Sequence, residues 1–261
     1  MQSRPFTYLF YLQYLGLRYS GWQKQTGVRT IQGTIEKALR FILGHEDFTI
    51  LGASRTDSGV SCYGGAFELF LKHEIPSELL DTLNGILPSD IRLLKVHPVS
   101  LDFNIIQDVA WKEYHYHFTF GEKFHPFVAG NLTFFQGKPD LELMESGARV
   151  FVGSHDFRQF CSIDKVTDNY VREIMDSRIS KHPMAGVGHI PDNALTYTVK
   201  GNGFLRYQIR IMVGALIDLS LGKLNLKEIK NALNAGEINP ISIAAPANGL
   251  VLEKIEFKNK G

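Results

Sequence analysis

Strand and helix patterns succeed one another in about the first hundred residues, and their order restricts the chain to a small set of folds. Residues 6–15 alternate in the manner of a strand, and residues 31–42 carry apolar side chains at helical spacing between Thr30, an N-cap, and Gly44, a stop. Two strands, a second helix and a further strand follow in residues 48–51, 66–72, 76–87 and 91–99. The order β-α-β-β-α-β predicts a ferredoxin-like unit with its helices on one face of a sheet.

The second half of the sequence predicts another α/β unit, although no sequence repeat relates it to the first. Asp140 is placed to cap a helix that runs to about Val150. The other predicted elements are strands in residues 112–120, 171–181, 195–200 and 249–257 and helices in residues 204–221 and 226–234. A chain of 261 residues can form two such domains. We therefore predict an α/β protein of the α+β kind, with domains at residues 1–106 and 107–261.

The composition excludes several classes of protein. Two cysteines, Cys62 and Cys161, are too few for a disulfide framework and too far apart for a zinc site, which favours a reducing cytoplasm. The apolar run at the N-terminus alternates and lacks a small-residue cleavage site, so it indicates a strand rather than a signal peptide. No apolar stretch reaches the ~18 residues of a membrane span. A net charge of +1 neither requires nor excludes a nucleic-acid partner, because binding depends on where the charges lie.

An arginine and an aspartate lie two positions apart in the loop LGASRTDSGVSCYGGAF. In an extended loop, residues i and i+2 point the same way, so Arg55 and Asp57 can address one site. Small neighbours such as Ser58 and Gly59 would let a bulky ligand approach closely. The alternative is a turn in which Asp57 bonds to its own backbone. Glycoside hydrolysis usually needs two carboxylates, and no second acid is paired with Asp57, so the pattern favours single-carboxylate chemistry at a sugar.

Two arginines occur in the stretch GFLRYQIRIMVGALIDLSLG, which is apolar on almost every side and should be buried. Arg206 and Arg210 are four residues apart and are predicted to share a helical face. A buried arginine is costly to desolvate unless a carboxylate meets it. One interpretation is a structural ion pair or a side chain that reaches solvent. The other is that Arg210 neutralises a catalytic acid, since a cation within ~4–6 Å lowers an aspartate pKa by about 1–3 units.

Seven separated stretches resemble one family, the TruA-type tRNA pseudouridine synthases, in order and spacing. They are GLRYSGWQKQ, SRTDSGV, LPSDIRLL, KEYHYHF, GSHDFRQF, FLRYQIRIMVGAL and APANGLVLEKIEF. The resemblance covers essentially the whole chain. It implies two ferredoxin/RNP-like domains with their sheets joined around a central active-site cleft. It also implies a cytoplasmic homodimer that isomerises uridine to pseudouridine in the anticodon stem-loop of tRNA, at positions 38–40, without a metal or organic cofactor.

The resemblance also implies a role for four residues. Asp57 matches the essential aspartate, which acts as the nucleophile or base. Arg55 matches the arginine that helps to displace the target base from the stack, and Tyr114 matches the tyrosine that packs on the uracil ring. Arg210 matches the arginine that pairs with the aspartate. Whether Asp57 attacks C1′ or removes the 2′ proton to give a glycal is left open by the sequence.

The sequence departs from the family pattern at several positions. Ser54 replaces a glycine before RTD, and Ile106 stands where the family has an arginine. Lys112 and Glu113 replace a strongly basic pair. Each lost cation that touched a phosphate would weaken RNA binding and lower its salt dependence by about one charge. Two alternatives therefore remain. One is a divergent paralogue that modifies another RNA or a subset of these uridines. The other is a non-catalytic RNA-binding or chaperone protein on the same scaffold.

Several other residues are candidates for RNA contacts, for a metal site or for structural roles. A groove is predicted to gather the basic residues Arg18, Lys24, Arg29, Arg55 and Arg158. His115 and His117 alternate on a strand, but without a third ligand at suitable spacing a metal site is not favoured. We interpret GSHDF as structural, with Phe157 and Phe160 in the core. Trp22 and Cys62 are interpreted as packing residues, and Gln23 as an RNA-side contact.

Overall fold

The computed structural model describes residues 4–162, 169–234, 236 and 239–258. Within these ranges the chain forms five α-helices and ten β-strands, and the predicted mixed α/β class of the α+β kind is confirmed. Two compact units divide the chain, one made of the described residues up to Ala110 and from Leu252 onwards, the other of residues 111–251. The end of the chain thus groups with the first unit, whereas the sequence analysis assigned it to the second domain. The resemblance implies that the two sheets join around a central active-site cleft, and this arrangement stays a prediction.

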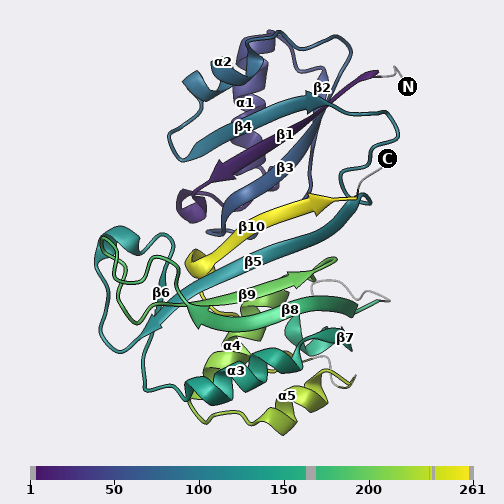
Figure 1. Cartoon of the computed structure of the whole chain (residues 1–261). Coiled ribbons are helices and arrows are strands. Elements are labelled where there is room, and N and C mark those ends of the chain that lie inside the picture. Colours follow the sequence, from purple (N-terminus) through teal and green to yellow (C-terminus); the bar gives the residue numbers. More distant parts are fainter. Residues whose placement is uncertain (1–3, 163–168, 235, 237–238, 259–261) are drawn as a thin grey trace. The chain divides into compact units, whose positions relative to one another are not determined.

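The first unit is a sheet with the strand order β4-β1-β3-β10, and β2 pairs with β3. Strand β1 runs antiparallel to both β3 and β4. Helices α1 and α2 lie on one side of this sheet (Figure 1), as the strand and helix order predicts. The bounds are Phe6–Tyr14 for β1, Ile31–Leu43 for α1, Phe48–Gly52 for β2, Ser61–Leu71 for β3, Leu79–Ile86 for α2, Ile91–Pro98 for β4 and Leu250–Phe257 for β10.

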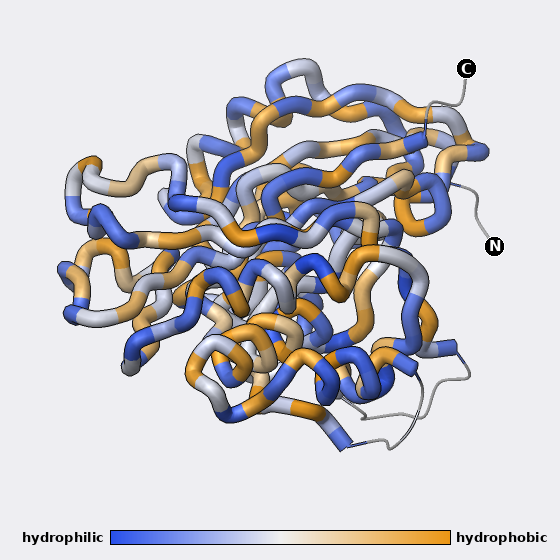
Figure 2. Tube along the Cα trace, turned by 60° about the horizontal axis from the view of Figure 1, so that its bottom comes forward, coloured by the Kyte–Doolittle hydropathy of each residue, from blue (hydrophilic) through white to orange (hydrophobic). Residues whose placement is uncertain are grey.

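Helix α1 shows how local sequence sets the elements of this unit. The Thr30 hydroxyl accepts a hydrogen bond from the Gly33 N–H at 3.2 Å, and Gly44 ends the helix with a φ of 73°. The helix buries Ile31, Ile35 and Leu39 completely, which contributes about 1.5–3 kcal/mol per side chain. Figure 2 shows hydrophobic and hydrophilic residues interleaved along the Cα trace. The predicted N-cap and stop of this helix are therefore confirmed.

The second unit is a sheet with the strand order β5-β9-β8-β7, and β6 pairs in parallel with β5. Tyr116 of β5 and Tyr197 of β9 are register partners, and both are fully buried. The bounds are Val109–Phe120 for β5, Thr133–Phe135 for β6, Leu141–Val150 for α3, Gly153–Asp156 for β7, Val171–Lys181 for β8, Leu195–Gly201 for β9, Gln208–Ser220 for α4 and Leu226–Ala232 for α5. The sequence patterns do not predict β6 or β7, which are too short for a periodicity to appear.

Helix α4 is buried on almost every side, as predicted, but it begins later than expected. Tyr207 adopts a φ of 61°, in the left-handed region, and a right-handed helix cannot continue through that conformation. The helix therefore starts at Gln208 rather than at Phe204. Arg206 precedes it and is exposed, so the predicted helical face shared by Arg206 and Arg210 is wrong. In the described part of the chain, no helix combines the length and apolar character that crossing a membrane demands.

Candidate active site

The loop that carries Asp57 is fixed at its centre by Thr56. The Thr56 hydroxyl lies 2.8 Å from the Tyr14 hydroxyl, and the Thr56 carbonyl accepts a 3.1 Å hydrogen bond from the Trp22 backbone N–H. Thr56 is buried, while Arg55 is exposed and Asp57 is half-buried. Burial therefore alternates over these three residues, as it does in an extended segment. That Arg55 and Asp57 address one site stays a prediction.

A turn closes this loop directly after Asp57. The Val60 N–H donates to the Asp57 carbonyl over 3.2 Å, and the Gly59 N–H donates to the Tyr19 carbonyl over 3.1 Å. Gly16 lies against the turn so closely that a Cβ there would come within 2.0 Å of the Val60 carbonyl oxygen. The stretch GLRYSGW, which contains the 3-10 helix Gly16–Arg18, therefore acts as the support on which the aspartate loop rests.

Trp22 supplies the apolar part of this support. It is 3% exposed, and a Cβ on Gly52 would lie 2.4 Å from its indole nitrogen. Its ring also meets those of Tyr14 and Phe67, with centroids 6.4 and 6.2 Å apart. The predicted packing role of Trp22 is confirmed. Gln23 is exposed, and its side-chain N–H donates to the side-chain Oε1 of Gln32 over 3.1 Å. Its predicted RNA contact stays a prediction.

Tyr19 and Asp90 form a charge network next to the same loop. The Tyr19 hydroxyl donates to Asp90 over 2.6 Å, Arg18 pairs with Asp90 at 2.5 Å, and the Arg29 guanidinium lies 4.6 Å from the centre of the Tyr19 ring. Burial raises the pKa of Tyr19, and the hydrogen bond with Asp90 adds to the rise, to about 12. Burial alone would raise the pKa of Asp90, but hydrogen bonds from Tyr19 and Arg18 outweigh it and lower that pKa. The carboxylate therefore stays ionised and holds the support together.

In the second unit, Tyr114 lies in β5 opposite Val199 of β9. It is 8% exposed, and its ring meets that of Phe204 edge-on, with centroids 5.3 Å apart. Phe204 lies just before α4, so this contact brings Tyr114 close to the start of that helix. Tyr116, on the same face of β5, donates its hydroxyl to the Pro246 carbonyl over 2.8 Å. Aromatic side chains of β5 thus contact Phe204, just before α4, and Pro246, in the segment before β10.

Arg210 lies in the first turn of α4 and is half-buried. Its Nε donates to the Ala245 carbonyl over 2.7 Å, and its guanidinium carbon lies 4.9 Å from the centre of the Tyr207 ring. The Arg210 carbonyl in turn accepts a 2.9 Å hydrogen bond from the Ala245 N–H. Burial raises the pKa of Tyr116, and the charge of Arg210 opposes part of that rise, so the guanidinium also acts on the neighbouring strand. This unit therefore holds a positively charged group among aromatic rings.

Comparison with known proteins decides the family. A family model described as tRNA pseudouridine synthase matches residues 11–107 and 148–258 of this chain. The chain belongs to the tRNA pseudouridine synthase family. Its enzymes are isomerases, and the matched segments include Arg55, Asp57 and Arg210. Tyr114 lies between the two matched segments, so its role rests on the resemblance of the KEYHYHF stretch.

Three relatives support the same family over the full chain. Each is named tRNA pseudouridine synthase A, and the Protochlamydia protein carries the further number 1. The protein of Thermodesulfovibrio yellowstonii is 35% identical over 94% of this chain and 97% of its own length. That of Streptococcus agalactiae is 33% identical over 95% and 94%, and that of Protochlamydia amoebophila is 32% identical over 97% of both chains.

The sequence analysis missed Tyr207 and Ala245 as neighbours of Arg210. Ala245 opens the family stretch APANGL, but nothing in its type or spacing indicates that its carbonyl oxygen binds a guanidinium. Among the described non-glycine residues, Tyr207 has a positive φ, and a tyrosine gives no local signal for that conformation. Both contacts depend on segments that meet only in the folded unit.

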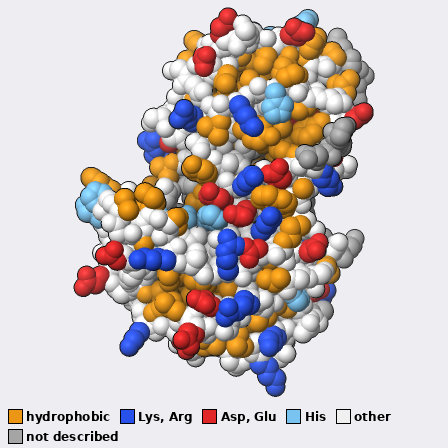
Figure 3. Space-filling model, in the orientation of Figure 1, with side chains coloured by type: hydrophobic (Ala, Val, Ile, Leu, Met, Phe, Trp, Pro, Cys, Tyr) orange, Lys and Arg blue, Asp and Glu red, His pale blue; other side chains and the backbone are white. Residues whose placement is uncertain are grey.

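The basic residues predicted to line an RNA groove are in large part engaged by neighbouring groups. Arg18 pairs with Asp90, and Arg29 lies over Tyr19. Lys24 pairs with Glu36 and Arg158 with Asp156, each over 2.6 Å. Basic and acidic side chains are also interspersed on the face shown in Figure 3. Arg55 is exposed and lies on the aspartate loop itself. The predicted RNA groove stays a prediction.

The positions that depart from the family pattern alter the surface. Ile106, which stands in place of a family arginine, is 61% exposed. Burial lowers the pKa of Lys112 to about 8, so this side chain is charged at neutral pH and loses its charge above pH 8. Glu113 lies 3.0 Å from the His115 ring nitrogen. These side chains present less positive charge than the family pattern would.

The remaining candidates have structural explanations. Phe157 and Phe160 are fully buried, as predicted, and the Cys62 thiol is buried with its pKa raised by desolvation. His117 packs 4.5 Å from the His182 ring, and burial lowers the pKa of His117 to about 3, so it is neutral. Within the described ranges, no group of three or more His, Cys, Asp or Glu side chains is arranged to hold a metal ion.

Proposed function

We propose that this protein isomerises uridine to pseudouridine in the anticodon stem-loop of tRNA, at positions 38–40, and that Asp57 is its catalytic carboxylate. The observation that carries this proposal is the family match to segments that include both Asp57 and Arg210. The fixed loop around Thr56 supports it, because Thr56 is buried while Arg55 beside it is exposed and Asp57 is half-buried. The resemblance further supports a cytoplasmic homodimer without a metal or organic cofactor.

The reaction exchanges one bond for another within the nucleotide. The bond from N1 of uracil to C1′ of the ribose breaks, the base turns, and C5 bonds to C1′ instead. The hydrogen at C5 leaves as a proton and N1 takes up a proton, so no oxidant or reductant is consumed. Asp57 either attacks C1′ or removes the 2′ proton, and in both routes it must be ionised when the nucleotide arrives.

The other three residues assist at separate steps. Extruding the base from its stack costs a few kcal/mol, and the exposed Arg55 can occupy the vacated space and hold a phosphate. Tyr114 gives the detached uracil an aromatic face, worth about 1–3 kcal/mol. Arg210 keeps the carboxylate of Asp57 ionised through a charge-assisted pair. The pairing of Arg210 with Asp57 stays a prediction.

A tritium-release assay tests the activity and the carboxylate together. tRNA transcripts labelled with tritium at uracil C5 should release the label to water in proportion to turnover. The variant Asp57→Asn should abolish release, because the amide can neither attack C1′ nor accept a proton. The matched control is Asp81→Asn, an exposed position on α2, which should retain full activity. Label release by Asp57→Asn at the unaltered rate would refute the proposed mechanism, and no release by the unaltered protein would refute the function.

The exposed Ile106 favours one second candidate, which is the same chemistry on a different RNA or on fewer uridines. Pseudouridine mapping of the host's RNA with and without this gene separates the two. Loss of the modification at positions 38–40 supports the first proposal, whereas loss confined to sites outside the anticodon arm supports the second.

A further inference from the structure

We propose that the segment Ser242–Ala245 positions Arg210 for the reaction, and that Gly214, Ser242 and Asp218 are positioning residues because they hold this segment on α4. The inference rests on the proposed role of Arg210. We refer to residues 242–245 as the strap.

The strap lies along one face of α4, and its residues contact successive turns of the helix. Arg210, Gly214 and Asp218 are spaced four residues apart, so they lie along the same side of the helix. Ala245 bonds to Arg210, the Ile243 backbone approaches Gly214, and Ser242 bonds to Asp218, which means that the strap runs antiparallel to the helix. Three successive contacts therefore fix where the Ala245 carbonyl oxygen lies.

The contact at Ala245 restricts the guanidinium directly. Nε of Arg210 donates to the Ala245 carbonyl over 2.7 Å, and the Ala245 N–H donates back to the Arg210 carbonyl over 2.9 Å. On another side the guanidinium stacks over Tyr207, whose left-handed backbone is itself costly and is a feature that clusters at functional sites. With Nε held in this way, the terminal nitrogens are set as the planar fork that matches a carboxylate.

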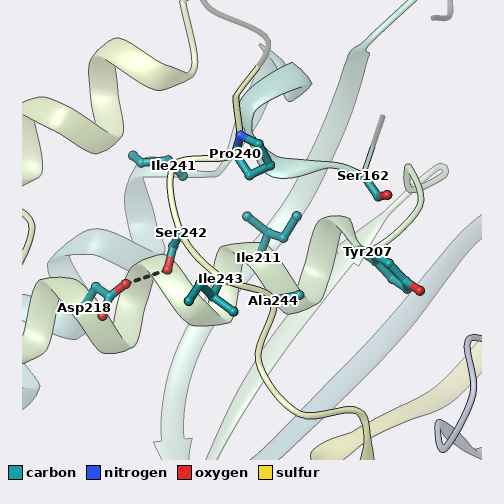
Figure 4. Close-up of a pocket in the computed structure, with 9 residues that line it drawn as sticks. All are labelled: Ser162, Tyr207, Ile211, Asp218, Pro240, Ile241, Ser242, Ile243 and Ala244. Atoms are coloured by element: carbon teal, nitrogen blue, oxygen red, sulfur yellow. Dashed lines mark hydrogen bonds between the residues drawn. The ribbon is translucent and has the colours of Figure 1, made fainter. Parts of the chain in front are cut away.

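Gly214 is required for the strap to lie this close. A Cβ at this position would come within 2.1 Å of the Ile243 carbonyl oxygen and 3.0 Å of the Ser242 Oγ. The nearest obstacle is backbone, so it cannot rotate away and the strap would have to shift. One turn further along, the Ser242 hydroxyl donates to Asp218 over 2.6 Å (Figure 4).

The strap has room to move when these contacts are lost. A cavity of about 620 Å³ lies against it, lined also by Ile211, Tyr207 and Ser162 (Figure 4). The Ile243 side chain is 88% exposed, so apolar packing does little to hold the strap. The chain is anchored on either side of the strap, where the Ile241 N–H donates to the Gln159 carbonyl over 3.0 Å and the Pro246 carbonyl accepts from Tyr116 over 2.8 Å. Between these anchors the contacts with α4 set its position, and a shift of the strap would move the Ala245 carbonyl that holds the Arg210 guanidinium.

Steady-state tritium release from labelled tRNA, measured over a range of tRNA concentrations, gives kcat and KM and tests this inference. A misplacement of about 1 Å in a reacting group can cost ~100-fold in rate, so Gly214→Ala should lower kcat by about 100-fold and Ser242→Ala by about 10-fold. The KM for tRNA should change by less than about threefold, because the strap does not supply the binding energy. The matched control is Gly85→Ala in α2, where a Cβ meets nothing within 4 Å, and its kcat should equal that of the unaltered protein.

A double-mutant cycle distinguishes positioning from a general structural effect. If the strap acts through Arg210, Gly214→Ala or Ser242→Ala should cause little further loss in an Arg210→Ala background. Multiplicative losses in that background, or folded single variants within twofold of the unaltered kcat, would overturn the inference. If Gly214→Ala fails to fold by circular dichroism, Ser242→Ala decides, because it removes one hydroxyl and adds no atom. An unaltered protein that releases no label instead refutes the proposed function.

Discussion

Replacing Glu68 with glutamine should remove a pH-dependent loss of stability from the first unit. Glu68 lies in β3 between Leu9 of β1 and Leu51 of β2, and it is 1% exposed. One carboxylate oxygen accepts a long 3.4 Å hydrogen bond from the Ile105 N–H, and the other meets no hydrogen-bond partner among the residues that the structure describes. Burial raises the pKa of Glu68, and the negative charge of Asp108 adds to the rise, to about 7.

The size and sign of the effect follow from this pKa. Below the ordinary value of 4.5 the carboxyl is protonated in both the folded and the unfolded chain, so it does not affect stability. Between 4.5 and about 7 the unfolded chain loses the proton first, and stability falls as the pH rises. Above this window the full loss is about 3 kcal/mol. Glutamine is neutral throughout, although placing its NH₂ at an unpaired position adds a constant cost of about 1–3 kcal/mol.

Urea unfolding of the first unit at pH values from 4 to 8 measures this effect. The chain has two tryptophans, and in a Trp111→Phe background the buried Trp22 reports the first unit alone. The unfolding free energy of Glu68→Gln minus that of its parent should increase by about 3 kcal/mol from low to high pH across this range. The constant cost of the glutamine NH₂ does not change this increase. The exposed Glu74→Gln is the matched control and should show no such trend. A difference for Glu68→Gln that stays constant with pH would refute the reasoning.

Two further predictions concern the first unit's charge network and the thiols. Tyr19→Phe removes the donor that helps to lower the pKa of Asp90. When the pH is lowered, the variant should therefore lose stability at a higher pH than the unaltered protein, as followed by circular dichroism. An unchanged acid transition would contradict this. Cys62 and Cys161 are buried with raised pKa values, so both thiols should react with a disulfide reagent at pH 8 only after urea is added. Rapid labelling of the folded protein would show that the burial is wrong.

Elements with strong local signals could be predicted from the sequence. The boundaries of α1 follow from Thr30 and Gly44, whose capping roles depend on backbone groups within a few residues. The long strands at Val171–Lys181 and Leu195–Gly201 also lie where their patterns indicate. Short strands such as β6 carry too few residues for a period, and they form because a neighbouring strand supplies the hydrogen bonds.

The sequence by itself determined the order of the helices and of the longer strands, the α+β class and, through ordered motifs, the family and the residues to test. Tertiary structure decided what surrounds those residues. It set the left-handed Tyr207 that delays α4, the Ala245 carbonyl that holds Arg210 from 35 residues away, and the isolation of Glu68. The physical reason is the distance along the sequence over which each kind of interaction acts. Periodicity and capping are interactions between near neighbours, whereas the partner of a buried charge comes from a segment that only folding brings into contact.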